Sequence, residues 1–179
     1  SCRHPALDAL DDTQQARANA QYAVRHDPFV YFHSIIDSPS CRANVVDLER
    51  LPGDLATEAT TPDYVFITPD LCHDGHDGTC ADGGPGGTPA ADAFVREWVP
   101  RIMGSPAYQS DGLLAIVFDE AASDSSACCG ERPGPNTPAP GAQSGGPGGG
   151  RTGAVLLSPF IRPGTTSDQQ YNHYGLLRS

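Results

Sequence analysis

The apolar run Leu113-Leu-Ala-Ile-Val-Phe118 constrains the fold most, because it is unbroken and ends directly in Asp119-Glu120. A short continuous apolar run after a turn signal is typical of a central strand in a parallel sheet, which is covered on both faces. The runs Tyr64–Thr68 and Ala154–Leu157 predict two more buried strands. Strands of this kind separated by helices indicate an α/β fold with a mainly parallel sheet.

Three stretches predict helices between and around these strands. Asp12–Arg25 begins with a capping residue and is rich in helix formers. A helix beginning at Pro89 is expected to have one apolar face, formed by Phe94, Val95, Trp98, Val99 and Ile102. A last helix is expected in Tyr171–Arg178. Residues 121–150 are crowded with Gly, Pro and Ser and predict a long flexible loop.

Length and charge bound the function. The chain has 179 residues, which fits one domain or part of one, and no apolar stretch is long enough for a transmembrane helix. Its net charge of −11 argues against a nucleic-acid partner, since phosphate backbones require basic patches. A phosphorylated substrate stays compatible with this charge, because a bound metal ion can reverse the local field.

Six cysteines indicate an oxidising compartment, and therefore a secreted or extracytoplasmic protein. Cys72 with Cys80 is the favoured pair because it closes a short loop, and Cys2 with Cys41 would tie the N-terminal segment down. The adjacent Cys128-Cys129 could form a vicinal disulfide or find separate partners. A zinc-thiolate site is disfavoured because no Cys-x-x-Cys spacing is present.

The loop Asp70–Cys80 carries the densest chemistry, with three aspartates, two histidines and two cysteines in eleven residues. It follows the expected strand Tyr64–Thr68, as Asp119-Glu120 follows another. Parallel strands joined by right-handed crossovers would bring both sets of side chains to one edge of the sheet. Carboxylates and imidazoles gathered there match a divalent metal site.

Plainer interpretations stand beside this one. Asp119-Glu120 is also what a solvated turn after a strand looks like, and Asp70–Asp77 could be an acidic surface loop. His26 fits a helix-end histidine favoured by the helix dipole, and His173 fits a residue at a helix start. A non-catalytic module that binds calcium through the aspartates of the loop is a further alternative, although the EF-hand spacing is missing.

Four segments in matching order resemble the phosphoesterase family of bacterial acid phosphatases and phosphatidylcholine-type phospholipases C. They are Tyr22–Phe32, Ile67–Asp77, Gly112–Glu120 and Tyr171–Arg178. Within the family the chain looks most like secreted actinobacterial acid phosphatases that act on phosphatidylinositol 3-phosphate. The resemblance implies an α/β/α sandwich like that of alkaline phosphatase, and a phosphorylated small molecule or a phosphoinositide lipid as substrate.

The resemblance also implies roles for residues. Asp119 and Glu120 fall on a metal-ligand pair for one divalent ion. His76 falls on the histidine that contacts the phosphate or leaving group, and His26 on one that lines the site. Candidates for an additional ligand, or for a donor that orients the ligands, are Asp74, Asp77 and His173. A metal ion and imidazoles would stabilise the charge on a transferring phosphoryl group.

Two family features are missing before Tyr22: a strand ending in Glu-Asn and a Ser or Thr nucleophile. Residues 1–179 are therefore expected to form the C-terminal portion of a phosphoesterase domain, with an incomplete sheet and activity that depends on the missing portion. The principal expected function is metal-dependent hydrolysis of phosphate monoesters. A phospholipase C-type phosphodiesterase and the calcium-binding module remain as alternatives.

Overall fold

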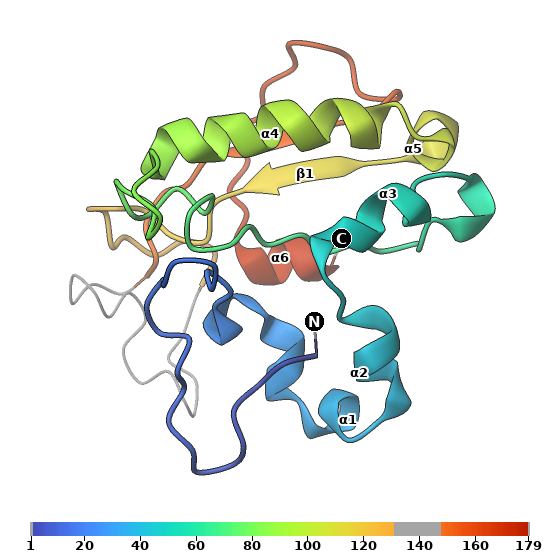
Figure 1. Cartoon of the computed structure of the whole chain (residues 1–179). Coiled ribbons are helices and arrows are strands. Elements are labelled where there is room, and N and C mark those ends of the chain that lie inside the picture. The colour runs from blue at the N-terminus through green and yellow to red at the C-terminus, as the bar shows by residue number, and fades with distance from the viewer. Residues whose placement is uncertain (1, 131–147, 179) are drawn as a thin grey trace. The chain divides into compact units, whose positions relative to one another are not determined.

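The computed structural model describes residues 2–130 and 148–178 (Figure 1). The chain divides into two compact units, Ser1–Ser110 and Asp111–Ser179. Within the described residues, no helix has the length and apolar character required to cross a membrane. The expected flexible loop at 121–150 falls largely on residues 131–147, outside the described residues, and its described ends contain no helix or strand.

Short helices dominate the first unit. In chain order the helices are η1 (Val24–His26), η2 (Pro28–Tyr31), α1 (His33–Ile36), α2 (Pro39–Asn44), η3 (Leu48–Arg50), α3 (Leu51–Asp54), η4 (Glu58–Thr60), the long α4 (Gly87–Met103) and α5 (Pro106–Asp111), whose last residue belongs to the second unit. Local caps set several of their starts. The Asp27 side chain accepts a hydrogen bond from Phe29 N, and that of Ser38 accepts one from Ser40 N.

The expected helix over Asp12–Arg25 is absent, and turns take its place. The Asp11 carboxylate accepts hydrogen bonds from the backbone N–H and hydroxyl of Thr13 and from the Gln14 amide. Thr13 Oγ1 in turn accepts a bond from Val24 N. Such side-chain bonds compete with helix formation, and Asn19 adopts φ 61°, which a right-handed helix does not allow.

The expected strand over Tyr64–Thr68 is also wrong in this structure, which assigns no strand there. Tyr64 is 65% exposed and Phe66 51% exposed, so the run is not covered on two faces. Phe66 instead packs edge-on against Phe29, with ring centroids 5.6 Å apart. The apolar character of the run therefore serves a local aromatic contact.

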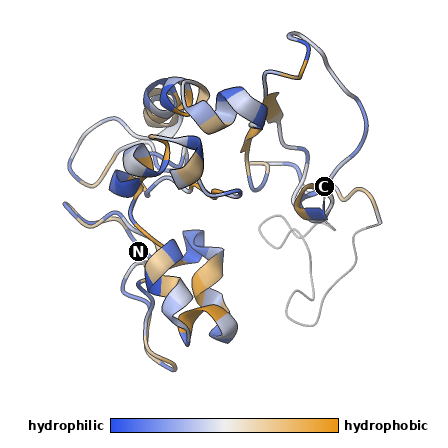
Figure 2. Ribbon diagram, turned by 90° about the vertical axis from the view of Figure 1, so that its right-hand side faces the viewer, coloured by the Kyte–Doolittle hydropathy of each residue, from blue (hydrophilic) through white to orange (hydrophobic). Residues whose placement is uncertain are grey.

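The long helix α4 confirms the prediction from the apolar spacing and begins at Gly87, two residues before Pro89. Its expected apolar face is partly buried throughout. Ion pairs at i,i+4 spacing occupy other positions of the helix: Arg96 with Asp92, and Arg101 with Glu97. Figure 2 shows the resulting alternation of hydrophobic and hydrophilic colouring along the helical ribbons.

Two small cores hold the first unit together, and a disulfide belongs to each. Val24, Val30 and Cys41 form one core, with the partly buried Tyr22 packed against it. The other joins Cys72, Cys80 and Ala90 at the start of α4. The predicted disulfides Cys2–Cys41 and Cys72–Cys80 are both formed. Cys72–Cys80 closes the loop after Asp70, and packing against Ala90 joins this loop to the beginning of the long helix.

The second unit contains β1 (Leu114–Val117), β2 (Ala154–Leu157) and α6 (His173–Arg178). Both strands match predicted runs, but they pair antiparallel, with Leu114 opposite Leu157 and Val117 opposite Ala154. The expected parallel arrangement is wrong for this sheet, because the sequence shows the strands and not their pairing. The described sheet has two strands, so the structure is a mixed helix and sheet fold.

The antiparallel pairing changes the surroundings of the acidic pair. The end of β1 lies beside the start of β2, so Asp119-Glu120 approach residues 148–151 instead of the end of another strand. Sheet residues are also more exposed than a central strand allows: Val117 is 40% and Val155 52% exposed. The vicinal disulfide Cys128–Cys129, one of the two pairings considered for these cysteines, is formed in this unit.

Candidate active site

The loop Asp70–Cys80 is anchored at its start by Asp70. One carboxylate oxygen, Oδ1, accepts hydrogen bonds from the backbone N–H of Cys72 and of His73, each at 3.1 Å. The same oxygen lies 2.6 Å from His73 Nδ1. Leu71 N donates to Gln21 O at 2.9 Å, which ties the loop to the segment before η1. Asp70 therefore stabilises the conformation of the loop.

His76 lies at the exposed tip of this loop and pairs with its neighbour Asp77. His76 Nδ1 lies 2.8 Å from Asp77 Oδ1, while the His76 side chain is 81% exposed. The hydrogen bond and the charge of Asp77 raise the pKa of His76 above 6.5. Asp74 Oδ1 accepts a bond from His76 N at 2.9 Å and fixes the backbone there. His76 Nε2 thus faces solvent on an oriented ring.

Gly86 presses against the carbonyl of Asp77. A Cβ built at Gly86 would lie 2.2 Å from Asp77 O, so only glycine fits without moving the backbone. Gly86 N also donates to Gly78 O at 3.3 Å. Together with the Cys72–Cys80 disulfide, this contact supports the backbone of the His76-Asp77 pair.

His26, the second expected catalytic residue, ends η1 and is partly buried. It directly precedes Asp27, which caps η2 and whose pKa is raised by burial. Tyr22 OH donates to Arg3 O at 2.8 Å and lies 3.4 Å from Asp27 Oδ2. His26 is thus held in a packed junction between two short helices.

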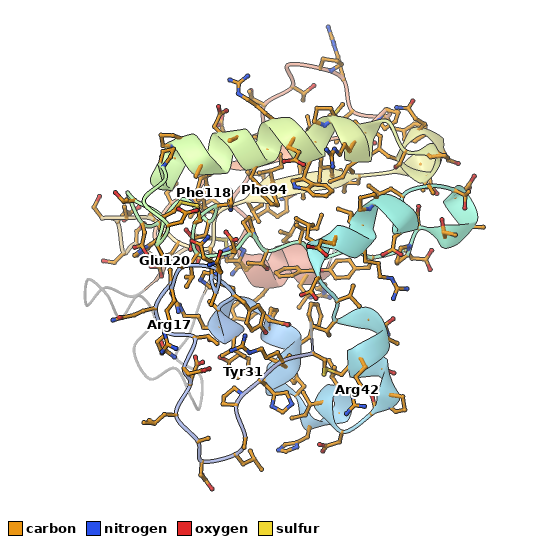
Figure 3. The ribbon with its side chains drawn as sticks, viewed as in Figure 1. Arg17, Tyr31, Arg42, Phe94, Phe118 and Glu120 are labelled. Carbon is orange, nitrogen blue, oxygen red and sulfur yellow. A yellow bond between two sulfur atoms is a disulfide. The ribbon has the colours of Figure 1, made fainter. Side chains whose placement is uncertain are left out.

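Asp119 and Glu120, the expected metal ligands, follow β1 in the second unit and are exposed. The Glu120 side chain is labelled in Figure 3. In the described part of the chain neither carboxylate takes part in a hydrogen bond or ion pair. Free carboxylate oxygens suit a hard divalent cation such as Mg²⁺, Mn²⁺ or Ca²⁺. Within the described residues of their own unit, no third side-chain ligand completes a cluster around them.

His173 starts α6 and lies close to the acidic pair. Its Nε2 lies 2.9 Å from the backbone carbonyl oxygen of Asp119. A carbonyl oxygen can only accept, so Nε2 must carry a proton and act as the donor. Of the two roles considered for His173, an orienting donor therefore agrees with the geometry, and Nε2 is not available as a ligand.

Three other side chains lie at metal-binding distances from one another, and their chemistry does not fit a metal. Ligand atoms of Asp70, Cys72 and His73 lie within 4.8 Å of one another. Cys72 is oxidised in a disulfide, so it offers no thiolate. Asp70 Oδ1 already accepts three hydrogen bonds. This group therefore stabilises the loop, through the bonds to Asp70 Oδ1 and the disulfide of Cys72.

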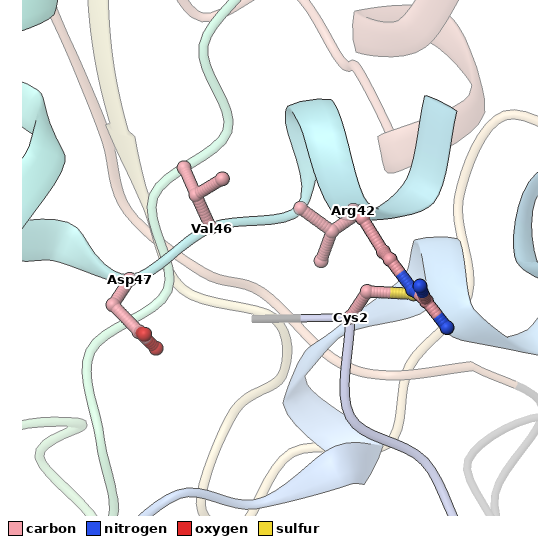
Figure 4. A pocket seen from close by; sticks show the side chains of 5 residues that line it. Cys2, Arg42, Val46 and Asp47 are labelled. Atoms are coloured by element: carbon pink, nitrogen blue, oxygen red, sulfur yellow. The ribbon is translucent and has the colours of Figure 1, made fainter. Parts of the chain in front are cut away.

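A surface hollow of about 350 Å³ lies elsewhere in the first unit (Figure 4). Cys2, Arg42, Val45, Val46 and Asp47 line it. None of the expected site residues contributes to it. The hollow therefore lends no support to the site inferred from the sequence.

The structure thus places the candidate residues in two groups. His26, Asp74, His76 and Asp77 lie in the first unit, and Asp119, Glu120 and His173 lie in the second. Contacts that sequence reasoning missed are those of Asp70 with His73 and of Gly86 with Asp77. The i,i+3 spacing of Asp70 and His73 was visible in the sequence, whereas the approach of Gly86 depends on the turn geometry.

Comparison with known proteins gives three fungal relatives. The chain is 23% identical to a probable acid phosphatase of Kluyveromyces lactis over 65% of this chain and 26% of that protein. It is 22% identical to an acid phosphatase of Aspergillus fumigatus, over 65% and 24%. A phosphate-repressible acid phosphatase of Penicillium chrysogenum is 24% identical over 89% and 32%.

The chain therefore spans about a quarter to a third of the length of these curated relatives. No solved structure matches it significantly. The model of the Phosphoesterase family matches residues 6–179, which is nearly the whole chain. On this match, the chain belongs to the Phosphoesterase family.

Proposed function

We propose that this chain contributes to a site for the metal-dependent hydrolysis of phosphate monoesters. The observation that carries the proposal is the oriented His76-Asp77 pair, exposed on a disulfide-closed loop in a chain of the Phosphoesterase family. The acid phosphatase names of the three relatives support the same reaction class. The substrate would be a phosphorylated small molecule or a phosphoinositide such as phosphatidylinositol 3-phosphate.

In this proposal His76 acts as the proton donor to the leaving-group oxygen. Asp77 holds the ring through Nδ1, which leaves Nε2 to deliver the proton. Because the pKa of His76 is raised, a larger fraction of the His76 side chains is protonated at a given pH than for an ordinary histidine, and a general acid must be protonated to act. His26 would line the same site and contact the phosphoryl oxygens.

Asp119 and Glu120 would hold the divalent ion, which supplies positive charge to the phosphoryl oxygens when bound. Their carboxylates support this role, because they are exposed and have no hydrogen-bond or ion-pair partner among residues 2–130 and 148–178. Asp74 and Asp77 would order the loop backbone and the His76 ring. We further propose that the nucleophile and the remaining ligands come from sequence outside these 179 residues, and that the protein acts outside the cytoplasm, where its disulfides persist.

The test is hydrolysis of p-nitrophenyl phosphate by the longest natural chain that contains these residues, with added Mn²⁺. We expect His76→Asn and Asp119→Asn each to lower kcat at least 100-fold. His33→Asn is the matched control, since His33 forms a similar exposed pair with Asp37 at 3.0 Å. Unchanged kcat in both site variants would refute the proposed function.

Substrate comparison separates the two phosphoesterase activities. A phosphomonoesterase hydrolyses p-nitrophenyl phosphate faster than bis(p-nitrophenyl) phosphate, and a phospholipase C-type enzyme shows the reverse preference. Vesicles containing phosphatidylinositol 3-phosphate then test the lipid substrate directly. Phosphate release from these vesicles that disappears in His76→Asn would support the phosphoinositide assignment, and no release would exclude it.

A further inference from the structure

The contact between His173 and the carbonyl of Asp119 connects two segments that lie 54 residues apart in the sequence. His173 is the first residue of α6, and Asp119 follows β1. The distance from Nε2 to the carbonyl oxygen is 2.9 Å, which is the usual length of an N–H···O bond. Both residues belong to the same unit, so the contact is part of its internal structure.

The direction of the His173 ring is set by the start of α6. Asn172 Oδ1 accepts a hydrogen bond from Gly175 N at 2.9 Å, which is the geometry of an N-cap. Asn172 O accepts a second bond from Leu176 N at 2.9 Å. On the other side, the Tyr171 carbonyl oxygen lies 3.4 Å from Cys128 Sγ. A disulfide sulfur has no hydrogen to donate, so this is a close sulfur–oxygen contact.

The backbone around Glu120 is held at both ends. His173 binds the carbonyl of Asp119, and Ala121 N donates to Gly149 O at 2.9 Å. The side chains of Asp119 and Glu120 take no part in this anchoring and stay exposed. Two main-chain anchors therefore fix the direction of the turn while both carboxylates are left available.

We propose that His173 is a positioning residue for the acidic pair Asp119-Glu120. It acts through the Asp119 carbonyl and does not touch the ligand. The inference depends on the proposed function, because it assumes that the two carboxylates bind a divalent cation. Outer hydrogen-bond partners of ligating side chains commonly contribute a factor of about 10 to 100 in metal affinity, and the lower end of this range is expected for a group that binds the ligand's main chain.

The first test is the ring tautomer of His173, read from its ring ¹⁵N resonances by NMR in the metal-free 179-residue chain. The geometry predicts a proton on Nε2. A ring that carries its proton on Nδ1 alone would break the proposed bond and overturn the inference. This readout is independent of both metal binding and activity.

The second test is calorimetric titration of the same chain with Mn²⁺. His173→Leu removes the donor and is expected to weaken binding about 10-fold or more. His173→Gln keeps an N–H that can reach the Asp119 carbonyl and is expected to recover most of the affinity. Leu177→Ala is the control on α6, since Leu177 is 81% exposed. If His173 only filled space, His173→Gln and His173→Leu would weaken Mn²⁺ binding to a similar extent.

The outcomes separate the inference from the function on which it rests. Wild-type affinity in His173→Leu, combined with loss of binding in Asp119→Ala, would refute the positioning role and leave the metal site intact. Unchanged binding in both Asp119→Ala and Glu120→Ala would refute the metal site itself. Absence of Mn²⁺ binding by the wild-type chain would refute the positioning inference, which requires the two carboxylates to bind the cation within these residues, while the proposed function would still be decided by the hydrolysis of p-nitrophenyl phosphate.

Discussion

His76 Nδ1 lies 2.8 Å from Oδ1 of Asp77, the next residue in the chain. Adjacent residues rarely face each other on regular secondary structure, and this pair is held by a turn that Asp74 and Gly86 both support. The contact orients an imidazole that is otherwise surrounded by solvent. It also leads to the most direct prediction for pH dependence.

Replacement of Asp77 by Asn is expected to lower the pKa of His76 towards 6.5, because the main cause of its raised value is the bond to Asp77. In this variant the His76 ring loses its proton at a lower pH than in the wild type. If hydrolysis requires a protonated His76, the fall of the reaction rate on the alkaline side of the pH profile therefore moves to lower pH. Because the folded-state pKa is raised, the pairing stabilises the folded chain below the unfolded pKa, and this contribution is lost as pH rises through the folded pKa.

The shift is measured by NMR titration of the His76 Cε1 proton in both chains. Asp63→Asn is a control, since Asp63 is an exposed aspartate outside the loop. Equal His76 titration curves in the wild type and Asp77→Asn would show that the pair does not form in solution.

Gly86→Ala is expected to destabilise the chain by about 1–3 kcal/mol, since the added Cβ would collide with the Asp77 carbonyl. The movement of Asp77 would also change the titration of His76. Gly78→Ala is the matched control in the same loop, because a Cβ there meets nothing within 4 Å. Denaturant unfolding monitored at Trp98 measures both variants, and a Gly86→Ala chain as stable as Gly78→Ala would contradict the close approach of Gly86 to Asp77.

The two disulfides of the first unit are expected to differ in their contribution to the free energy of unfolding. The loop-entropy relation gives about 2.5 kcal/mol for Cys72–Cys80, with a separation of 8, and about 4 kcal/mol for Cys2–Cys41, with a separation of 39. Loss of packing at Cys41, which is fully buried, adds to the second value. This order is tested with two double variants, each with both cysteines of one disulfide replaced by alanine. Their free energies of unfolding are measured by Trp98 fluorescence, and a larger loss of stability without Cys72–Cys80 than without Cys2–Cys41 would contradict the prediction.

The sequence predicted those parts of the fold that depend on a strong local pattern. The apolar spacing from Phe94 to Ile102 predicted α4, and the unbroken runs at Leu114–Val117 and Ala154–Leu157 predicted two strands. The prediction of a helix over Asp12–Arg25 failed because side chains such as Asp11 bind backbone N–H groups that a helix would use, as at Thr13. The prediction of a parallel sheet failed because the direction of a strand depends on the strand with which it pairs. Strand direction in the sheet is a tertiary property that neither run encodes.

The candidate site shows the same division. Residue types pointed to His76 and Asp119, and left His173 as a residue at a helix start or an orienting donor. The structure pairs His76 with Asp77, and His173 with the backbone carbonyl of Asp119. The sequence did not predict the donor role of His173 or the support of Asp77 by Gly86, because turns bring these residues together. Family resemblance supplied the roles, which the contacts alone do not.

The most direct test of the proposed metal ligands is paramagnetic broadening by Mn²⁺ in the 179-residue chain. If Asp119 and Glu120 hold the ion, Mn²⁺ broadens the ring-proton signals of His173, whose Nε2 lies 2.9 Å from the Asp119 carbonyl oxygen, and Asp119→Ala abolishes the effect. Asp168→Ala, at an exposed aspartate of the same unit, should leave the broadening unchanged. His173 signals that stay sharp while Mn²⁺ is bound, or broadening that persists in Asp119→Ala, would contradict the assignment of the ion to these two carboxylates.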